Sequence, residues 1–176
     1  HPNQLTRDNF TTFVSDLSSQ CKMSNEKCEI SIDIFADSAI KSRLYDLPRL
    51  NKIVDLVIVM AYDFYRPSSP QSGPVAPLRA RCSSVPSPVI GRGIPLLREG
   101  EGGEGGEGGE VSSGVPCLDY DVVTSIADIS QSISARKIIL GVPFYGYQWQ
   151  TVDAQFMART LPDTGQTATY QKIQSL

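Results

Sequence analysis

Apolar residues recur at helical spacing in three stretches of the chain. Residues 6–21 carry one apolar stripe, which predicts an amphipathic helix with Thr6 as its N-cap and a buried face. Residues 47–52, with Pro48 in the first turn, and residues 120–133, with Asp119 or Asp121 as a cap, predict two further helices. The stripe of the first helix consists of Phe10, Phe13, Val14, Leu17 and Cys21.

Three other stretches have the patterns of strands. Isoleucines alternate with polar residues over residues 29–36, whereas residues 53–62 and 137–143 are apolar on both faces. Strands that are apolar on both faces are typical of parallel sheets covered by helices on each side. The order of helices and strands therefore predicts an α/β fold of parallel β-α units, with too few strands to close a barrel alone.

Residues 79–116 interrupt this order. They contain Ser-Pro-rich sequence and a Glu-Gly-Gly repeat over residues 99–110, and they lack apolar periodicity. Such a composition buries too little surface to offset the entropy of ordering it, so we predict a disordered insertion. We expect three parts: a segment with two strands at 1–78, the insertion at 79–116, and a segment with the third strand at 117–176.

Charge and composition narrow the possible functions. The net charge is −3, and without the five Glu of the repeat it would be +2, so nothing favours a nucleic-acid partner. His1 is the only histidine, which argues against a histidine-dependent catalytic group or zinc site. No apolar run approaches the roughly 20 residues that span a bilayer, so we expect no membrane partner. We interpret both ends of the chain as cuts in a longer protein.

Two of the four cysteines lie close together in the sequence. Cys21 and Cys28 could form a disulfide between the first helix and the first strand, or remain two unpaired thiols. We favour the thiols slightly, because Cys21 lies on the apolar stripe of the helix, where a free cysteine packs well.

Aromatic and acidic residues gather where the predicted strands end. Phe35 and Asp37 follow the first strand, Tyr62, Asp63 and Tyr65 the second, and residues 144–149 the third. Functional side chains of parallel β/α folds lie at these carboxyl ends. Rings and carboxylates together suit a sugar ligand, and the alternative is an apolar rim of buried, hydrogen-bonded tyrosines.

Several motifs resemble glycoside hydrolase family 18, the chitinase family. Residues 55–64 (DLVIVMAYDF) resemble its sixth barrel strand, which carries Met-x-Tyr-Asp, and residues 137–146 (KIILGVPFYG) resemble its seventh. Residues 73–78 are similar to the loop after the sixth strand, and residues 16–36 to the fifth helix-strand step. The resemblance spans residues 8–78 and 118–150 and implies part of a (β/α)8 TIM barrel.

The resemblance also implies a reaction. Family members hydrolyse β-1,4-linked N-acetylglucosamine polymers, chitin or peptidoglycan, by substrate-assisted catalysis without a cofactor or metal. The resemblance implies that Tyr62 donates its phenol to the acetamide carbonyl of the substrate. It also implies that Asp63 binds the sugar or its N-acetyl group, and both residues would support catalysis. Met60 would line the acetamide pocket, and Tyr145 and Trp149 the substrate groove. A secreted or cell-envelope location would suit such a polysaccharide partner.

One family feature is missing from the sequence. The signature Asp-x-x-Asp-x-Asp-x-Glu, whose Glu is the general acid, does not occur. We expect it upstream of residue 1, in strand four of the barrel. The alternative function is a chitinase-like lectin that binds the polymer without cleaving it, and the deciding residue lies outside this chain.

Overall fold

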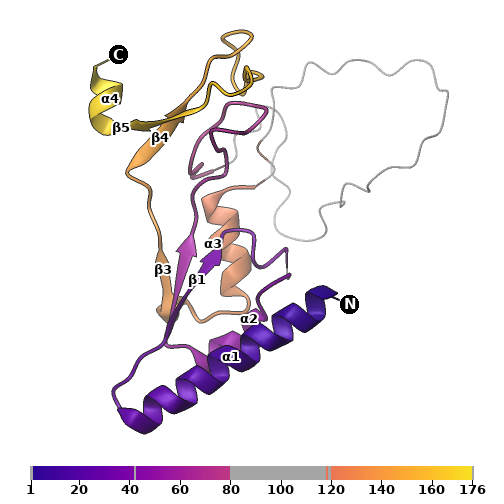
Figure 1. The fold of residues 1–176 in the computed structure, drawn as a ribbon, viewed down its shortest axis with the longest axis vertical. Helices are drawn as coiled ribbons and strands as arrows, with labels where there is room; N and C mark the ends of the chain where they lie inside the picture. The colour runs from indigo at the N-terminus through magenta and orange to yellow at the C-terminus, as the bar shows by residue number, and fades with distance from the viewer. Residues whose placement is uncertain (1, 42, 80–117, 119, 176) are drawn as a thin grey trace, which may run out of the picture.

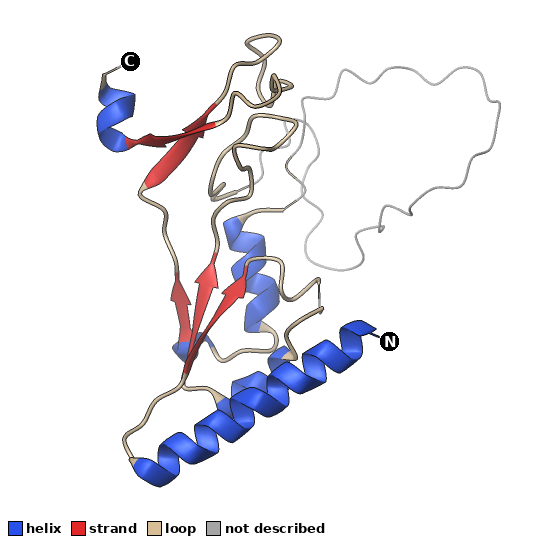
Figure 2. Ribbon diagram, viewed as in Figure 1, coloured by secondary structure: helices blue, strands red, loops and turns tan. Residues whose placement is uncertain are grey.

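The computed structural model describes residues 2–41, 43–79, 118 and 120–175 (Figure 1). The predicted insertion therefore lies almost wholly outside the described residues. The described residues form a parallel sheet with its helices and a smaller antiparallel sheet beyond the carboxyl ends of the parallel strands (Figure 2).

The parallel sheet contains the three predicted strands. β1 (Ser31–Phe35), β2 (Leu56–Met60) and β3 (Ile138–Leu140) lie in the order β1-β2-β3, each parallel to its neighbour. Ile58 is the central residue of one row across the sheet, with Asp33 on one side and Ile139 on the other. The prediction of parallel β-α units is confirmed, and each strand is shorter than its apolar run.

Helices cover one face of this sheet. The helices are α1 (Pro2–Ser24), α2 (Leu47–Ile53) and α3 (Val122–Ser130). Their apolar side chains form the core together with every second residue of the strands. Within the described residues no element covers the other face, and the side chains of β1 and β2 on that face are half-buried or exposed. The helix-facing strand residues of the core are Ile32, Ile34, Val57 and Val59.

Two carboxylates start the shorter helices, and the sequence predicts one of them, Asp121. Asp46 accepts a hydrogen bond from the backbone N–H of Arg49, and Pro48 occupies the first turn of α2. Asp121 accepts from the backbone N–H of Thr124 at 2.7 Å. These bonds satisfy backbone donors that a helix start leaves without partners, so both boundaries follow from local sequence.

α1 departs from the prediction in two respects. The helix begins at Pro2, so Thr6 lies inside it and is not the N-cap; proline suits a first turn, and no residue before Thr6 stops the helix. The buried stripe is also partly wrong, because Phe13 and Leu17 are 62% and 44% exposed, while Thr11 and Ser18 are buried. Hydroxyl groups can lie on the inner face because they bond to backbone carbonyls, Thr11 to Arg7 and Ser18 to Ile53.

β3 is less buried than its sequence predicts. Ile139 and Leu140 are each 43% exposed, although the run 137–143 was expected to be covered on both faces. Among the described strands β3 lies at the edge of this sheet and pairs with β2 alone. Its apolar side chains therefore lack the next strand and helix against which such a run packs.

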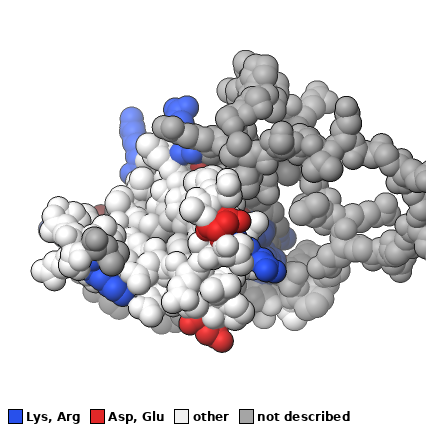
Figure 3. Space-filling model, turned by 90° about the horizontal axis from the view of Figure 1, so that it is seen from above, with Lys and Arg blue, Asp and Glu red and all other residues white. Residues whose placement is uncertain are grey.

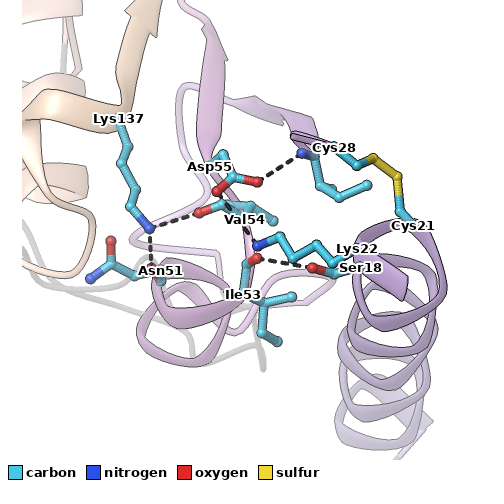
Figure 4. A network of polar contacts seen from close by, with 10 residues as sticks. Ser18, Cys21, Lys22, Cys28, Asn51, Ile53, Val54, Asp55 and Lys137 are labelled. Atoms are coloured by element: carbon cyan, nitrogen blue, oxygen red, sulfur yellow. Dashed lines mark hydrogen bonds and ion pairs between the residues drawn. A yellow bond between two sulfur atoms is a disulfide. The ribbon is translucent and has the colours of Figure 1, made fainter. Parts of the chain in front are cut away.

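A disulfide and a polar network fix the amino ends of the strands (Figure 4). Cys21 and Cys28 form a disulfide, so the preference for two free thiols is wrong. The turn after α1 brings the cysteines to a Cα–Cα distance of 5.8 Å, which a disulfide can span. Asp55 bonds to the backbone N–H of Ile30 at 2.9 Å, and Lys137 donates to two backbone carbonyls at the end of α2.

The last part of the chain forms the smaller sheet. β4 (Tyr145–Gln148) pairs antiparallel with β5 (Gln166–Thr169), and α4 (Tyr170–Gln174) follows directly. A short 3-10 helix, η1 (Ala135–Lys137), precedes β3. Among the helices that the structure describes, none is long and apolar enough to cross a bilayer.

Candidate active site

The candidate site lies at the carboxyl ends of the parallel strands, where β4 and the loop after β2 meet (Figure 1). Both segments follow strands of the parallel sheet: residues 61–79 leave β2, and residues 141–148 leave β3 and continue as β4. The parallel sheet therefore holds the starting points of the two segments that carry the site.

A local change of backbone direction brings Tyr62 and Asp63 to the same neighbour. In an ideal strand, consecutive side chains point to opposite faces. β2 ends at Met60, and Asp63 has φ of 59°, a left-handed conformation that aspartate adopts more readily than most residues. The Tyr62 ring contacts the Tyr145 ring at 6.5 Å between centroids, and Asp63 bonds to the Tyr145 hydroxyl.

Asp63 accepts two phenolic hydrogen bonds on one oxygen atom. The Tyr145 hydroxyl donates to Oδ1 at 2.7 Å, and the Tyr147 hydroxyl donates to the same atom at 2.8 Å. Residues two apart in a strand share a face, which is why both phenols of β4 reach one carboxylate. These bonds link the end of β2 to β4 across more than 80 residues of sequence.

The aromatic rings form a continuous row that runs away from Tyr62. The ring centroids of Tyr145 and Tyr147 lie 5.6 Å apart, and those of Tyr147 and Trp149 lie 5.9 Å apart. Both contacts are edge-to-face, as is the contact between Tyr62 and Tyr145. The indole N–H of Trp149 donates to the carbonyl of Pro67 at 3.1 Å. The row thus follows one face of β4 and is anchored at its far end to the loop after β2.

Met60 and Gly141 lie at the starting points of the two segments, where β2 and β3 end. Met60 is the last residue of β2 and is half-buried, next to Phe35 in the register of the sheet. A Cβ atom added at Gly141 would lie 3.0 Å from both the Tyr62 ring and the Val59 carbonyl oxygen. The lack of a side chain at Gly141 therefore lets the Tyr62 ring lie against the backbone that follows β3.

The phenols of Tyr145 and Tyr147 are held in their protonated form. Burial, followed by the hydrogen bond to Asp63, raises the pKa of Tyr145 well above its ordinary value. The same two causes, in the same order, raise the pKa of Tyr147. Both groups therefore remain hydrogen-bond donors at neutral and moderately alkaline pH.

The predicted residues come together only in part. Tyr62, Asp63 and Tyr145 form one cluster, Met60 ends β2 two residues before Tyr62, and Trp149 marks the far end of the row of rings. Other strand-end candidates lie apart from it: Asp37 pairs with Lys41 at 2.7 Å, and Phe144 is 91% exposed. The sequence-based site omitted Tyr147, although its spacing of two from Tyr145 places it on the same face of β4.

Charge is sparse at this end of the molecule. Seen from above, most described residues are neither acidic nor basic (Figure 3). Among the described residues, no group of three or more His, Cys, Asp or Glu could hold a metal ion. The chemistry of this cluster consists of phenolic donors, one carboxylate and aromatic faces.

Parallel strands with helices on one face, and polar and aromatic groups at their carboxyl ends, define a segment of a (β/α)8 barrel. The sequence model of glycosyl hydrolases family 18 matches residues 2–176, and the chain belongs to this family. A search of curated proteins gives no match.

Solved structures with the same fold include three from different kingdoms. A class V chitinase from Nicotiana tobaccum is 18% identical, with a TM-score of 0.65 over 96% of this chain and 43% of that one. An immunomodulatory active chitinase from Trichuris suis is 17% identical, with a TM-score of 0.67 over 95% and 42%. A putative sporulation-specific glycosylase from Bacillus subtilis is 21% identical, with a TM-score of 0.57 over 97% and 42%. The chain spans less than half the length of each.

Proposed function

We propose that this chain forms strands five to seven of a family 18 barrel that hydrolyses β-1,4-linked N-acetylglucosamine polymers by substrate-assisted catalysis. The observation that carries the proposal is the cluster of Tyr62, Asp63 and Tyr145 at the carboxyl ends of the parallel strands. The cluster joins a free phenol, a carboxylate and aromatic surface, which are the groups that an N-acetylated sugar requires.

The Tyr62 hydroxyl is the group best placed to act on a ligand. Within the part of the chain that the structure describes, it makes no hydrogen bond, whereas the hydroxyls of Tyr145 and Tyr147 are both engaged. In the proposed reaction, the acetamide carbonyl oxygen of the substrate bonds to the anomeric carbon as the glycosidic bond breaks. Tyr62 donates a hydrogen bond to the acetamide, and water then attacks the anomeric carbon and restores the acetamide.

The other residues bind and orient the sugar in this proposal. Asp63 accepts from the sugar or from its acetamide N–H, Met60 lines the acetamide pocket, and Tyr145 and Trp149 line the groove. The row of rings offers apolar faces for pyranose rings. The sparse charge at this end of the barrel suits a neutral polysaccharide better than a polyanion.

The general acid comes from outside these 176 residues in this proposal. The sequence lacks the family signature whose Glu protonates the leaving oxygen, and the chain covers 43% of the tobacco chitinase. The open face of the parallel sheet would be closed by the remaining strands, because barrel interiors are filled by side chains from all strands. The catalytic unit is therefore the full-length protein that contains this chain.

The family and two of the neighbouring structures support this substrate class. The structure of the tobacco chitinase was also solved as a point mutant in complex with NAG4. The Bacillus neighbour is a putative sporulation-specific glycosylase, and the family resemblance gives peptidoglycan beside chitin as a candidate polymer. A disulfide between Cys21 and Cys28 supports an oxidising compartment, such as the cell envelope or the exterior.

The experiment compares the full-length protein with its Tyr62→Phe variant on colloidal chitin and on purified peptidoglycan. We expect the wild type to release new reducing ends and the variant to release them at a much lower rate. Binding of either polymer without any release would favour the lectin alternative. A protein that neither binds nor cleaves either polymer would overturn the proposal.

A further inference from the structure

Tyr147 is the one member of the cluster that the resemblance to the family does not assign. Its hydroxyl donates to Asp63 Oδ1 at 2.8 Å, next to the 2.7 Å bond from Tyr145. Its ring packs between those of Tyr145 and Trp149. It therefore contacts both the carboxylate and the aromatic row.

The two phenols make the two oxygens of the Asp63 carboxylate different, because both phenols donate to Oδ1. A carboxylate oxygen has two lone pairs, and the two phenols occupy both on Oδ1. No described residue donates to Oδ2, which leaves that oxygen as the acceptor for a ligand. Two donors on one oxygen atom also fix the plane of the carboxylate more firmly than one donor does. With one hydrogen bond, the carboxylate can still rotate about its side-chain torsion.

The backbone at Asp63 makes such fixation necessary. The φ of 59° lies in a region that non-glycine residues occupy at some cost, and the surrounding contacts must hold the residue there. Tyr145 and Tyr147 do so from β4, which pairs with β5 and is thus part of a sheet and not of a free loop. The anchor for Asp63 is therefore a regular element.

We propose that Tyr147 is a positioning residue: together with Tyr145 it holds the Asp63 carboxylate so that Oδ2 accepts a hydrogen bond from an N-acetylated sugar. This role rests on the function proposed above. The Tyr147 hydroxyl does not touch the sugar in this arrangement, and its effect on binding passes through Asp63.

The opposing possibility is that Tyr147 only fastens β4 to the loop after β2. The two possibilities differ in a double-mutant cycle. A positioning role requires that the loss of the Tyr147 hydroxyl matters only while the Asp63 carboxylate is present. A fastening role affects stability, and its effect on binding is the same whether or not residue 63 is a carboxylate.

The experiment uses the full-length protein that contains this chain and measures the dissociation constant of tetra-N-acetylchitotetraose by calorimetry in the cold, with a chromatographic check that the ligand stays intact. The variants are Tyr147→Phe, Asp63→Asn and the double variant. Tyr147→Phe keeps the ring and is expected to weaken binding about fivefold, the loss that corresponds to one hydrogen bond. In the Asp63→Asn background the same change is expected to have no effect.

A spectroscopic measurement tests the contact itself without any sugar. NMR of carbon-labelled tyrosine follows each phenol through an alkaline titration, with assignments from the single Tyr→Phe variants. Asp63→Asn is expected to move the ionisation of Tyr145 and Tyr147 to lower pH, because the acceptor carboxylate has gone. The matched control is Tyr170→Phe, which removes an exposed phenol of α4 and should alter neither measurement.

The outcomes separate the two proposals. Coupling in the cycle, with shifted phenol ionisation, supports the positioning role. Equal weakening by Tyr147→Phe in both backgrounds, or no weakening at all, overturns that role and leaves the proposed function intact. A wild-type protein that binds no N-acetylated oligosaccharide overturns both.

Discussion

The Tyr147 hydroxyl and the Asp63 carboxylate lie 2.8 Å apart although 84 residues separate them in the chain. The contact joins the end of β2 to β4, and with the Tyr145 bond it makes Asp63 the centre of the candidate site. The variants below are made in the full-length protein that we propose contains this chain.

Tyr62→Phe should lower turnover by about 100-fold, the typical effect of removing one donor to a reacting group. Stability should change little, because no described residue uses the Tyr62 hydroxyl as a partner and the ring contact with Tyr145 remains. Initial rates and thermal unfolding of the same preparation check both expectations, with Tyr170→Phe as the silent control. Unchanged turnover per folded molecule would remove Tyr62 from the site.

Gly141→Ala should displace the Tyr62 ring, because the new methyl group would lie 3.0 Å from its Cε1 atom and from the Val59 carbonyl oxygen. We expect a loss of about 1–3 kcal/mol in the free energy of unfolding, as for other overpacked sites, together with reduced turnover. Gly146→Ala is the matched control, since a Cβ there meets nothing within 4 Å. Equal behaviour of the two variants would contradict the close approach.

Cys21→Ser and Cys28→Ser should each lower the free energy of unfolding by about 2 kcal/mol, since a short disulfide loop still restricts the unfolded chain. The double variant should lose no more than either single variant, because all three break the same bond. Chemical denaturation with and without a reductant measures this. Wild-type stability that does not respond to a reductant would show that the disulfide adds nothing.

Excision of residues 79–116 should leave the fold and the activity in place. The flanks lie side by side: Val122 donates its backbone N–H to Pro77 at 2.9 Å, and Val123 donates to Leu78 at 3.3 Å. A short linker can therefore join them, and loop-closure entropy changes by only about 0.6 kcal/mol per doubling of loop length.

Limited proteolysis of the intact protein gives an independent check on this segment. Its composition predicts rapid cleavage between residues 79 and 116, with the flanking parts protected. Survival of the segment under conditions that nick other loops would contradict the predicted disorder, as would an excised variant that no longer folds.

Stability should fall at alkaline pH through Tyr120. Burial, with a further contribution from the charge of Asp128, raises the pKa of Tyr120 to about 12. The folded protein therefore holds a proton that the unfolded chain releases near its ordinary value of 10.0, so this contribution is intact below that pH and is lost as pH rises toward 12. Denaturation at several alkaline pH values should show the decline, and Tyr120→Phe should make it shallower while Tyr145 and Tyr147, whose pKa values are also raised, still contribute; an unchanged slope would contradict a contribution from Tyr120.

The sequence by itself determined most of the local structure. Alternation and double-faced apolar runs predict β1, β2 and β3 because burial on one or both sides of a sheet leaves that periodicity in the residues. Asp46 and Asp121 begin α2 and α3 because a capping carboxylate acts on backbone groups within its own turn. Tyr62, Asp63, Tyr145 and Trp149 were recognisable because their motifs follow apolar strands, although their roles remain proposals.

Only the tertiary structure decided which faces are buried and which residues meet. The outward position of Phe13 and the exposure of β3 depend on which neighbours each element has, and an element's own periodicity does not record its neighbours. The pairing of Cys21 with Cys28 depends on the turn between them. The Asp63–Tyr147 contact depends on the backbone turn at Asp63 and on the course of β4, two conformations set far apart in the chain, so no local pattern could predict it.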